Sequence, residues 1–158
     1  LGEAKGVVEL LDALRGLPCE VRLAGRQSSP AVEAAIAALR AAGTRVIAES
    51  AWGPDDRHPA RDLHLAVFPS KCQETYGLVV DEALAHGVPC LLSDNGAFAE
   101  RGDQPGVVVT SLPNLRTTLH DLVTAPERIE TLRAAIPATL PTIATAAERY
   151  LALYRSIA

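Results

Sequence analysis

Short apolar runs alternate with longer amphipathic segments along most of the chain. The short runs, rich in valine and leucine, are typical of strands buried in a parallel sheet. The longer segments carry apolar residues three and four positions apart, which predicts helices with one buried face. Strands are expected at residues 20–24, 44–48, 63–68, 88–93 and 107–109.

The first helix is predicted from the spacing of Val7, Leu10, Leu11 and Leu14, and Gly16 ends it. The second is expected to begin at Ser29-Pro30, because serine caps free backbone N–H groups and proline suits the first helical position. A loop with one short helical turn is expected over residues 49–60. The remaining predicted helices cover residues 77–87, 112–122, 126–136 and 141–154.

Strands that alternate with helices of this length form βαβ units with right-handed crossovers. The sequence therefore predicts an α/β fold: a Rossmann-like parallel sheet sandwiched by helices, with extra helices at the C-terminus. A length of 158 residues fits a single domain spanning residues 1–158.

Composition excludes several classes of protein. The apolar content of 48% is too high for a disordered chain, and no apolar stretch is long enough to span a bilayer. A net charge of -4 without a long basic run makes nucleic acid an unexpected partner. The cysteines, Cys19, Cys72 and Cys90, form no C-x-x-C pair, so we expect no zinc cluster, no disulfide framework and a cytoplasmic location. The chain starts at Leu1 and contains no methionine, which indicates part of a longer protein.

Ligands of parallel α/β sheets bind beyond the carboxyl ends of the strands. Those ends are predicted at Gly25, Pro69-Ser70, Ser93-Asp94 and Thr110. The candidate site is therefore formed by the loops at residues 26–28, 70–75 and 94–97, together with the turn that holds Lys5.

Two carboxylates flank the start of the helix expected after residue 76. Glu74 precedes this helix, and Glu82 is expected about two turns inside it. A helix start offers free N–H groups and a positive dipole end to a phosphate, and a carboxylate holds a vicinal diol well. The pair could therefore bind two diols of one ligand with a phosphate between them. The simpler interpretation is an acidic residue favoured by the helix dipole and a solvated surface residue.

Other candidates also have simpler interpretations. Lys5 could contact a phosphate or be a solvated lysine, and Gly77 could admit a ligand or only cap a helix. Trp52 and Tyr76 could stack on a base or only pack against neighbours. His86 is interpreted as a favourable positive charge at a helix C-terminus.

Several motifs are missing from the sequence. It contains no G-x-G-x-x-G, no G-x-x-x-x-G-K-[ST], no H-E-x-x-H, no D-x-D and no G-x-S-x-G. No base is identifiable near Cys72, so a catalytic thiol is not expected. We expect no metal site and no cofactor.

Five segments together resemble the C-terminal half of a GT-B glycosyltransferase, and most of all the retaining family 4. The resemblance runs from Lys5 to about Arg101 and is most specific in the E-x7-E pattern from Glu74 to Glu82. The segments are K-G-V-V-E-L-L-D-A-L, V-R-L-A-G, D-L-H-L-A-V-F-P-S, E-T-Y-G-L-V-V-D-E-A-L-A-H-G-V-P and S-D-N-G-A-F-A-E-R.

The resemblance implies a role for each site residue toward a nucleotide-sugar donor. Glu74 would hold hydroxyls of the transferred sugar, and Glu82 the nucleotide ribose. Lys5 would neutralise the leaving diphosphate. The backbone amides of Tyr76, Gly77 and Leu78 would bind the same diphosphate. Thr75, Gly25 and Arg26 complete the predicted donor-binding residues, and Arg26, Gln27 and the Trp52 loop are expected to line the base pocket.

The implied reaction is transfer of a sugar to a glycan or lipid-type acceptor, with retention and without a metal. The acceptor domain would lie outside this chain, and so would any association with the inner face of a membrane. Family members carry an arginine five residues before the lysine, and that position also falls outside this chain. Two departures from the family pattern are His64, where an aspartate is common, and a single glycine in residues 24–27. The isolated chain is expected to bind nucleotide weakly and to be inactive alone.

Two alternatives stay open at this stage. One is a non-catalytic nucleotide-sugar-binding or interaction domain of the same fold. The other is half of a non-hydrolysing epimerase, which would need a different set of acidic residues and histidines in its cleft. The last helix, with Tyr150 and Tyr154, is expected to pack across the other half of the full protein. The base, the sugar and the acceptor are not specified by the sequence.

Overall fold

The strands form two parallel sheets in a computed structural model that describes residues 2–26, 29–49, 51–53 and 55–157. Strand β1 (Val21–Ala24) pairs with β2 (Val46–Glu49). Strands β3 (Ala66–Phe68), β4 (Cys90–Ser93) and β5 (Val107–Thr110) form the second sheet in that order. The predicted parallel α/β architecture is confirmed, although the described strands divide into two hydrogen-bonded sheets.

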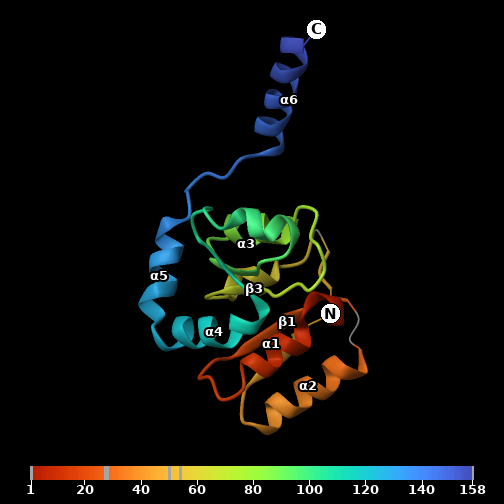
Figure 1. Cartoon of the computed structure of the whole chain (residues 1–158), viewed down its shortest axis with the longest axis vertical. Coiled ribbons are helices and arrows are strands. Elements are labelled where there is room, and N and C mark those ends of the chain that lie inside the picture. Colours follow the sequence, from red (N-terminus) through yellow and green to blue (C-terminus); the bar gives the residue numbers. More distant parts are fainter. Residues whose placement is uncertain (1, 27–28, 50, 54, 158) are drawn as a thin grey trace.

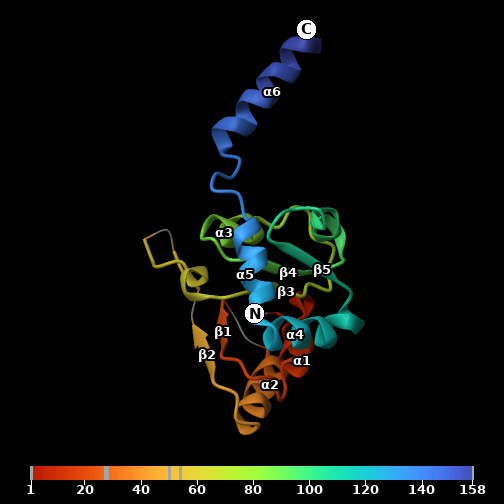
Figure 2. The ribbon, with the colours of Figure 1, turned by 90° about the vertical axis from the view of Figure 1, so that its left-hand side faces the viewer.

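Helices follow the strands in the expected alternation (Figures 1 and 2). The α-helices are α1 (Val7–Ala13), α2 (Pro30–Ala41), α3 (Leu78–Ala85), α4 (Leu115–Thr124), α5 (Pro126–Ala135) and α6 (Ile143–Ile157). Short 3-10 helices are η1 (Glu3–Lys5), η2 (Pro59–Asp62), η3 (Gly96–Arg101) and η4 (Leu112–Asn114). Helix α2 begins as predicted, because the Val32 N–H donates to the Ser29 hydroxyl at 3.3 Å and Pro30 occupies the first turn.

Strand β4 is buried on both faces, which is the mark of a central parallel strand. Leu91 packs into a cluster with α1, α2, α4 and α5, whereas Cys90 and Leu92 pack into a second cluster with α3. The two clusters are therefore the two sides of one Rossmann-like layer arrangement. Side chains of β1 and β2 join the first cluster, so the two sheets share a core.

Strand β3 is shorter than the predicted run of residues 63–68. Residues before it are used by other elements: the Leu63 N–H closes η2 on the Ala60 carbonyl, and the His64 carbonyl accepts from the Arg133 guanidinium at 3.2 Å. The ladder starts only where the Ala66 N–H donates to the Pro89 carbonyl. The residue pairs Phe68–Leu92 and Ser93–Thr110 place the ends of the three strands at one edge, as the site prediction required.

Two local predictions need correction. The turn expected at residues 94–96 continues into η3, and Glu82 lies just over one turn, not two, inside α3. The helix begins at Leu78 and ends after eight residues, since Gly77 adopts a left-handed conformation and His86 is the C-cap. Glu82 is therefore closer to the helix start than the sequence analysis assumed.

Helix α6 stands away from the rest of the described chain (Figures 1 and 2). None of its residues is buried, and Tyr150, Leu151 and Tyr154 are exposed. Among the described residues, no helix combines the length and apolar character needed to cross a membrane.

Candidate functional site

The loop between β3 and α3 is fastened to the end of β4. The Ser70 carbonyl accepts hydrogen bonds from the Ser93 hydroxyl at 2.7 Å and from the Asn95 side-chain amide at 2.8 Å. Farther along the loop, the Ala97 N–H donates to the Glu74 carbonyl at 2.8 Å. These bonds fix the position of Glu74 at the carboxyl edge of the sheet, where a ligand is expected.

The N-terminal turn is bound to the same loop from the other side. The Ala4 carbonyl accepts from the Lys71 and Cys72 N–H groups at 2.9 and 3.3 Å. The Lys71 ammonium donates to Glu9 on α1 at 2.6 Å. The turn that carries Lys5 is thus held beside Glu74, although the two residues are far apart in the sequence.

Lys5 and Glu74 form an ion pair with 2.5 Å between Nζ and Oε1. Lys5 Nζ also lies 3.6 Å from the Cys72 sulfur. The Glu74 side chain is only 15% exposed, whereas Lys5 is 56% exposed. Glu74 is thus a largely buried carboxylate with a cationic partner, a contact that neither interpretation of this residue anticipated.

The ion pair raises the pKa of Lys5 and lowers the pKa of Glu74. The hydrogen bond to Glu74 raises the pKa of Lys5 above 10.5, against a smaller opposing effect of burial. Burial alone would raise the pKa of Glu74, but hydrogen bonds from Lys5 and Ser70 and the charge of Lys5 together lower it below 4.5. Both groups are therefore charged near neutral pH.

We expect the pair to stabilise the fold only where Glu74 is ionised. Because the folded state lowers the pKa of Glu74, its contribution is present above pH 4.5 and is lost as the pH falls through the lowered value. Glu74→Gln should cost up to about 1 kcal/mol at pH 7, a small effect because Lys5 is well solvated. Urea unfolding of both proteins at about pH 7 and about pH 3 measures this, and an equal difference at both pH values would contradict it.

The start of α3 lies directly after this loop. Gly77 caps the helix with φ +80°, and a Cβ at this position would collide with the Phe98 ring. Any larger residue would have to displace that buried ring. Gly77 is therefore a helix cap, and it brings the backbone close to η3. Thr75, Tyr76 and Leu78 around it are exposed, and the first N–H groups of a helix have no partner within it.

Arg101 holds this helix start in place and was missed by the sequence analysis. Its guanidinium binds both carboxylate oxygens of Asp81 at 2.8 and 3.1 Å and donates to the Tyr76 carbonyl at 3.1 Å. It also lies 5.0 Å from the centre of the Tyr76 ring. The side chain is 12% exposed, and the bond to Asp81 raises its pKa. No local pattern signals a contact between residues so far apart in sequence.

Glu82 faces a group of rings rather than only solvent. His58 Nε2 lies 3.6 Å from Glu82 Oε2. The His58 ring is 4.7 Å from that of His86 and 5.3 Å from that of Trp52. His58 is therefore in contact with both the Trp52 ring and Glu82. His58 was not among the predicted site residues, although an acceptor side chain directly before Pro59 is a recognisable start of a helical turn.

His86 is the C-cap of α3, as expected, but its surroundings disfavour the positive charge. Burial lowers its pKa below 6.5, and the nearby His58 and Arg61 lower it further. The neutral imidazole therefore prevails at neutral pH.

The remaining predicted residues lie elsewhere in the described chain. Gly25 and Arg26 follow β1 directly, at the carboxyl end of that strand, and Arg26 is exposed. Gln27 and Ser28 fall outside the described residues. Glu74 and Glu82 have different partners. The candidate site therefore consists of two groups: Lys5 with Glu74 before the start of α3, and His58 with Glu82 after it.

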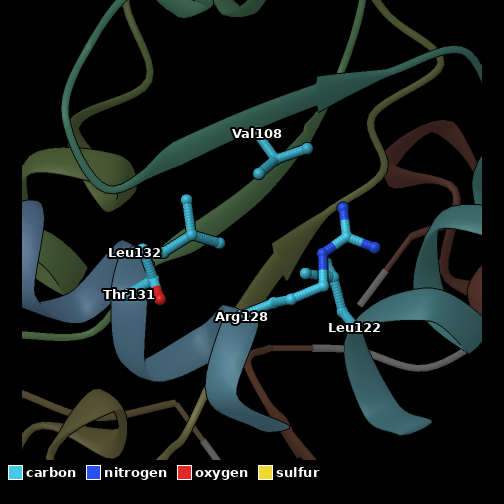
Figure 3. A pocket seen from close by; sticks show the side chains of 5 residues that line it. All are labelled: Val108, Leu122, Arg128, Thr131 and Leu132. Atoms are coloured by element: carbon cyan, nitrogen blue, oxygen red, sulfur yellow. The ribbon is translucent and has the colours of Figure 1, made fainter. Parts of the chain in front are cut away.

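A small cavity of about 230 Å³ lies between β5, α4 and α5 (Figure 3). Apolar side chains and the Arg128 guanidinium line it, and none of the predicted site residues does. Its lining residues are Val108, Leu122, Arg128, Thr131 and Leu132. Within the described ranges, no group of three or more His, Cys, Asp or Glu side chains is arranged to hold a metal ion.

Solved structures with a similar fold include a glycosyltransferase and a complex with a nucleotide sugar. HepE (Alr3699) of Anabaena in complex with UDP-glucose matches with a TM-score of 0.69 at 19% identity, over 86% of this chain and 40% of that one. AviGT4, a glycosyltransferase involved in avilamycin A biosynthesis, matches with a TM-score of 0.62 at 20% identity, over 99% of this chain and 48% of that one. These structures confirm the predicted GT-B-type, Rossmann-like fold. The chain spans less than half the length of either protein.

A search of curated proteins gave no match. The family described as Glycosyl transferases group 1 matches residues 1–136, which is most of the chain. The chain therefore belongs to the group 1 glycosyl transferases.

Proposed function

We propose that this chain is the donor-binding half of a glycosyltransferase that transfers a sugar from a nucleoside-diphosphate sugar. The observation that carries the proposal is the ion pair between Lys5 and Glu74 beside the open start of α3. The cation and the free helix N–H groups suit the diphosphate of such a donor, and the carboxylate suits its sugar hydroxyls.

The diphosphate is placed at the helix start. Its negative charge would be met by the N–H groups of Tyr76, Gly77 and Leu78 and by the positive end of the α3 dipole. The solvated Lys5 ammonium can turn from Glu74 to a phosphate oxygen, since it is 56% exposed. As the bond to the sugar breaks, charge grows on the departing diphosphate, and these donors stabilise it.

The sugar and the ribose are placed on the two carboxylates. Glu74, ionised and fixed by the loop, would accept hydrogen bonds from hydroxyls of the transferred sugar. Glu82 would hold the ribose, with the Trp52 ring and Arg26 beside the base. This order along the ligand follows the order of the groups along the loop and helix.

We also propose that the transfer retains the configuration of the sugar and needs no metal ion. In the same proposal, a proton of the acceptor passes to a phosphate oxygen of the donor. The acceptor, a glycan or lipid, would bind another domain. The support is that the solved relatives are more than twice as long as this chain. We place the enzyme in the cytoplasm, and any association with the inner face of a membrane would depend on another domain.

Ligand-observed NMR titrations with UDP, GDP, ADP and TDP test the proposal, with UDP first because HepE binds it. At least one nucleotide should bind, and Glu82→Ala should weaken that binding roughly tenfold, because it removes a charged acceptor of two hydroxyl groups. Glu33→Ala is the control, since Glu33 is an exposed glutamate in the first turn of α2. Wild-type affinity in Glu82→Ala would show that the ribose assignment is wrong. The purified chain alone is expected to transfer no sugar.

A further inference from the structure

We infer that His58 is a positioning residue for Glu82: it orients the carboxylate through one ring N–H, and this makes the site prefer a ribonucleotide to its 2′-deoxy form. The inference rests on the proposed function, because it takes Glu82 as the ribose ligand. His58 lies in the segment before η2, outside every motif that the family resemblance uses.

The proton of the His58 ring is assigned by the backbone. The Ala60 N–H donates to His58 Nδ1 at 3.2 Å, as the cap of η2. A nitrogen that accepts a hydrogen bond carries no proton, so the neutral ring bears its proton on Nε2. That nitrogen is the one that lies nearest Glu82.

Two neighbouring rings fix the plane of the imidazole. The Trp52 ring meets His58 edge-on at 77°, and the His86 ring lies tilted by 35°. His86 is predominantly neutral at pH 7, because burial lowers its pKa. With the ring held on both sides and at Nδ1, the Nε2–H direction toward Glu82 is set before any ligand binds.

The Nε2–H donor lacks a full hydrogen bond in the ligand-free chain. The atom is shielded from solvent and has no hydrogen-bond partner among the described residues. Glu82 Oε2 at 3.6 Å is just beyond hydrogen-bond length. A buried donor without a partner is costly, so a small shift of the half-exposed Glu82 side chain toward His58 is favourable. Binding of a ligand to the other carboxylate oxygen would fix Glu82 in that shifted position.

The consequence is selectivity for a diol. With Oε2 held by His58, Glu82 Oε1 is left for the ribose, and its acceptor positions can receive both hydroxyls at once. A 2′-deoxy nucleotide offers only one hydroxyl, so it gains less from the oriented carboxylate. Without His58 the carboxylate is free to rotate, and the gain from the second hydroxyl is reduced.

Two substitutions separate the functions of the ring. In His58→Asn, the side-chain oxygen takes the place of Nδ1 and keeps the Ala60 cap, but nothing reaches Glu82. In His58→Gln, the side-chain amide nitrogen takes the place of Nε2 and keeps a donor to Glu82. Calorimetric titration of the 158-residue chain should use the tightest-binding nucleoside diphosphate of the panel, its 2′-deoxy counterpart and inorganic pyrophosphate.

We expect His58→Asn to bind the ribonucleotide about fivefold to tenfold more weakly and to lose the preference over the deoxy form, whereas His58→Gln keeps it. Affinity for pyrophosphate should not change in either variant. His120→Asn, a substitution of an exposed histidine on α4, is the control. A preserved preference in His58→Asn, an equal loss in His58→Gln, or no preference in the wild type would each overturn the inference.

NMR of the His58 ring gives a second readout that a merely structural role would not affect. Long-range ¹H–¹⁵N spectra should show the proton on Nε2, and its signal should move on addition of the ribonucleotide but not in Glu82→Ala. A proton on Nδ1 would overturn the inference. If Glu82→Ala binds nucleotide like the wild type, the ribose assignment fails and the inference fails with it. If Glu82→Ala weakens binding but His58→Asn keeps the preference, only the inference about His58 fails.

Discussion

Gly6→Ala is expected to destabilise the chain by about 2–5 kcal/mol. Gly6 joins η1 to α1 with φ +68°, and a Cβ there would overlap the Pro69 carbonyl oxygen. Both sides of this contact are backbone, so neither can give way without moving α1 or the end of β3. The loss is a large part of the 5–15 kcal/mol by which such domains are usually stable.

Gly43→Ala separates the backbone effect from the clash. Gly43 also has a positive φ, +91°, but no atom lies within 4 Å of the position of an added Cβ. In this variant the free energy of unfolding should fall by only about 1 kcal/mol, the cost of a positive φ for a residue with a Cβ. Urea unfolding of the three proteins measures the difference, and equal losses for Gly6→Ala and Gly43→Ala would contradict the close approach seen at Pro69.

The fold was predictable because its signals are local. The valine and leucine runs of β1, β4 and β5 and the spacing of Val32, Ile36 and Leu39 in α2 report burial directly. The Ser29-Pro30 start of α2 also depends only on neighbouring residues. Such features need no knowledge of the rest of the chain.

The errors arose where a distant residue decides the local structure. Strand β3 starts late because Arg133, on α5, takes the His64 carbonyl. Helix η3 ends at Arg101, whose guanidinium is directed to Asp81 and Tyr76, about twenty residues earlier. A pattern of neighbouring residues carries no information about such contacts, so both features were missed.

The candidate site was predictable in outline for a different reason. The rule that ligands bind at the carboxyl ends of parallel strands selected the Glu74 loop and the turn that holds Lys5, which the structure brings together, and the family resemblance assigned roles within them. Neither could show that Lys5 pairs with Glu74 in the ligand-free chain or that His58 approaches Glu82. Both contacts join residues that the fold, not the sequence, makes neighbours.

The pairing of Lys5 with Glu74 leads to the second large effect, in which two substitutions act in opposite directions. Lys5→Ala should weaken binding of the nucleoside diphosphate about 30-fold to 100-fold, since it removes a charged donor to a charged group. Glu74→Gln should strengthen binding of the same ligand by about threefold, because Glu74 no longer competes for the ammonium. It should weaken binding of the nucleotide sugar, whose hydroxyls lose their carboxylate.

Lys71→Ala is the matched control, because Lys71 is the other lysine of the sequence, lies in the loop that carries Glu74 and is paired with Glu9. It should bind nucleoside diphosphate like the wild type in calorimetric titrations at low and moderate salt. The difference in affinity between the wild type and Lys5→Ala should become smaller as salt is added, because salt screens a solvated ammonium from the phosphate. If Lys71→Ala and Lys5→Ala weaken binding equally, the effect is general charge attraction. If Glu74→Gln weakens binding of the nucleoside diphosphate, Glu74 supports the diphosphate site instead of competing for its lysine.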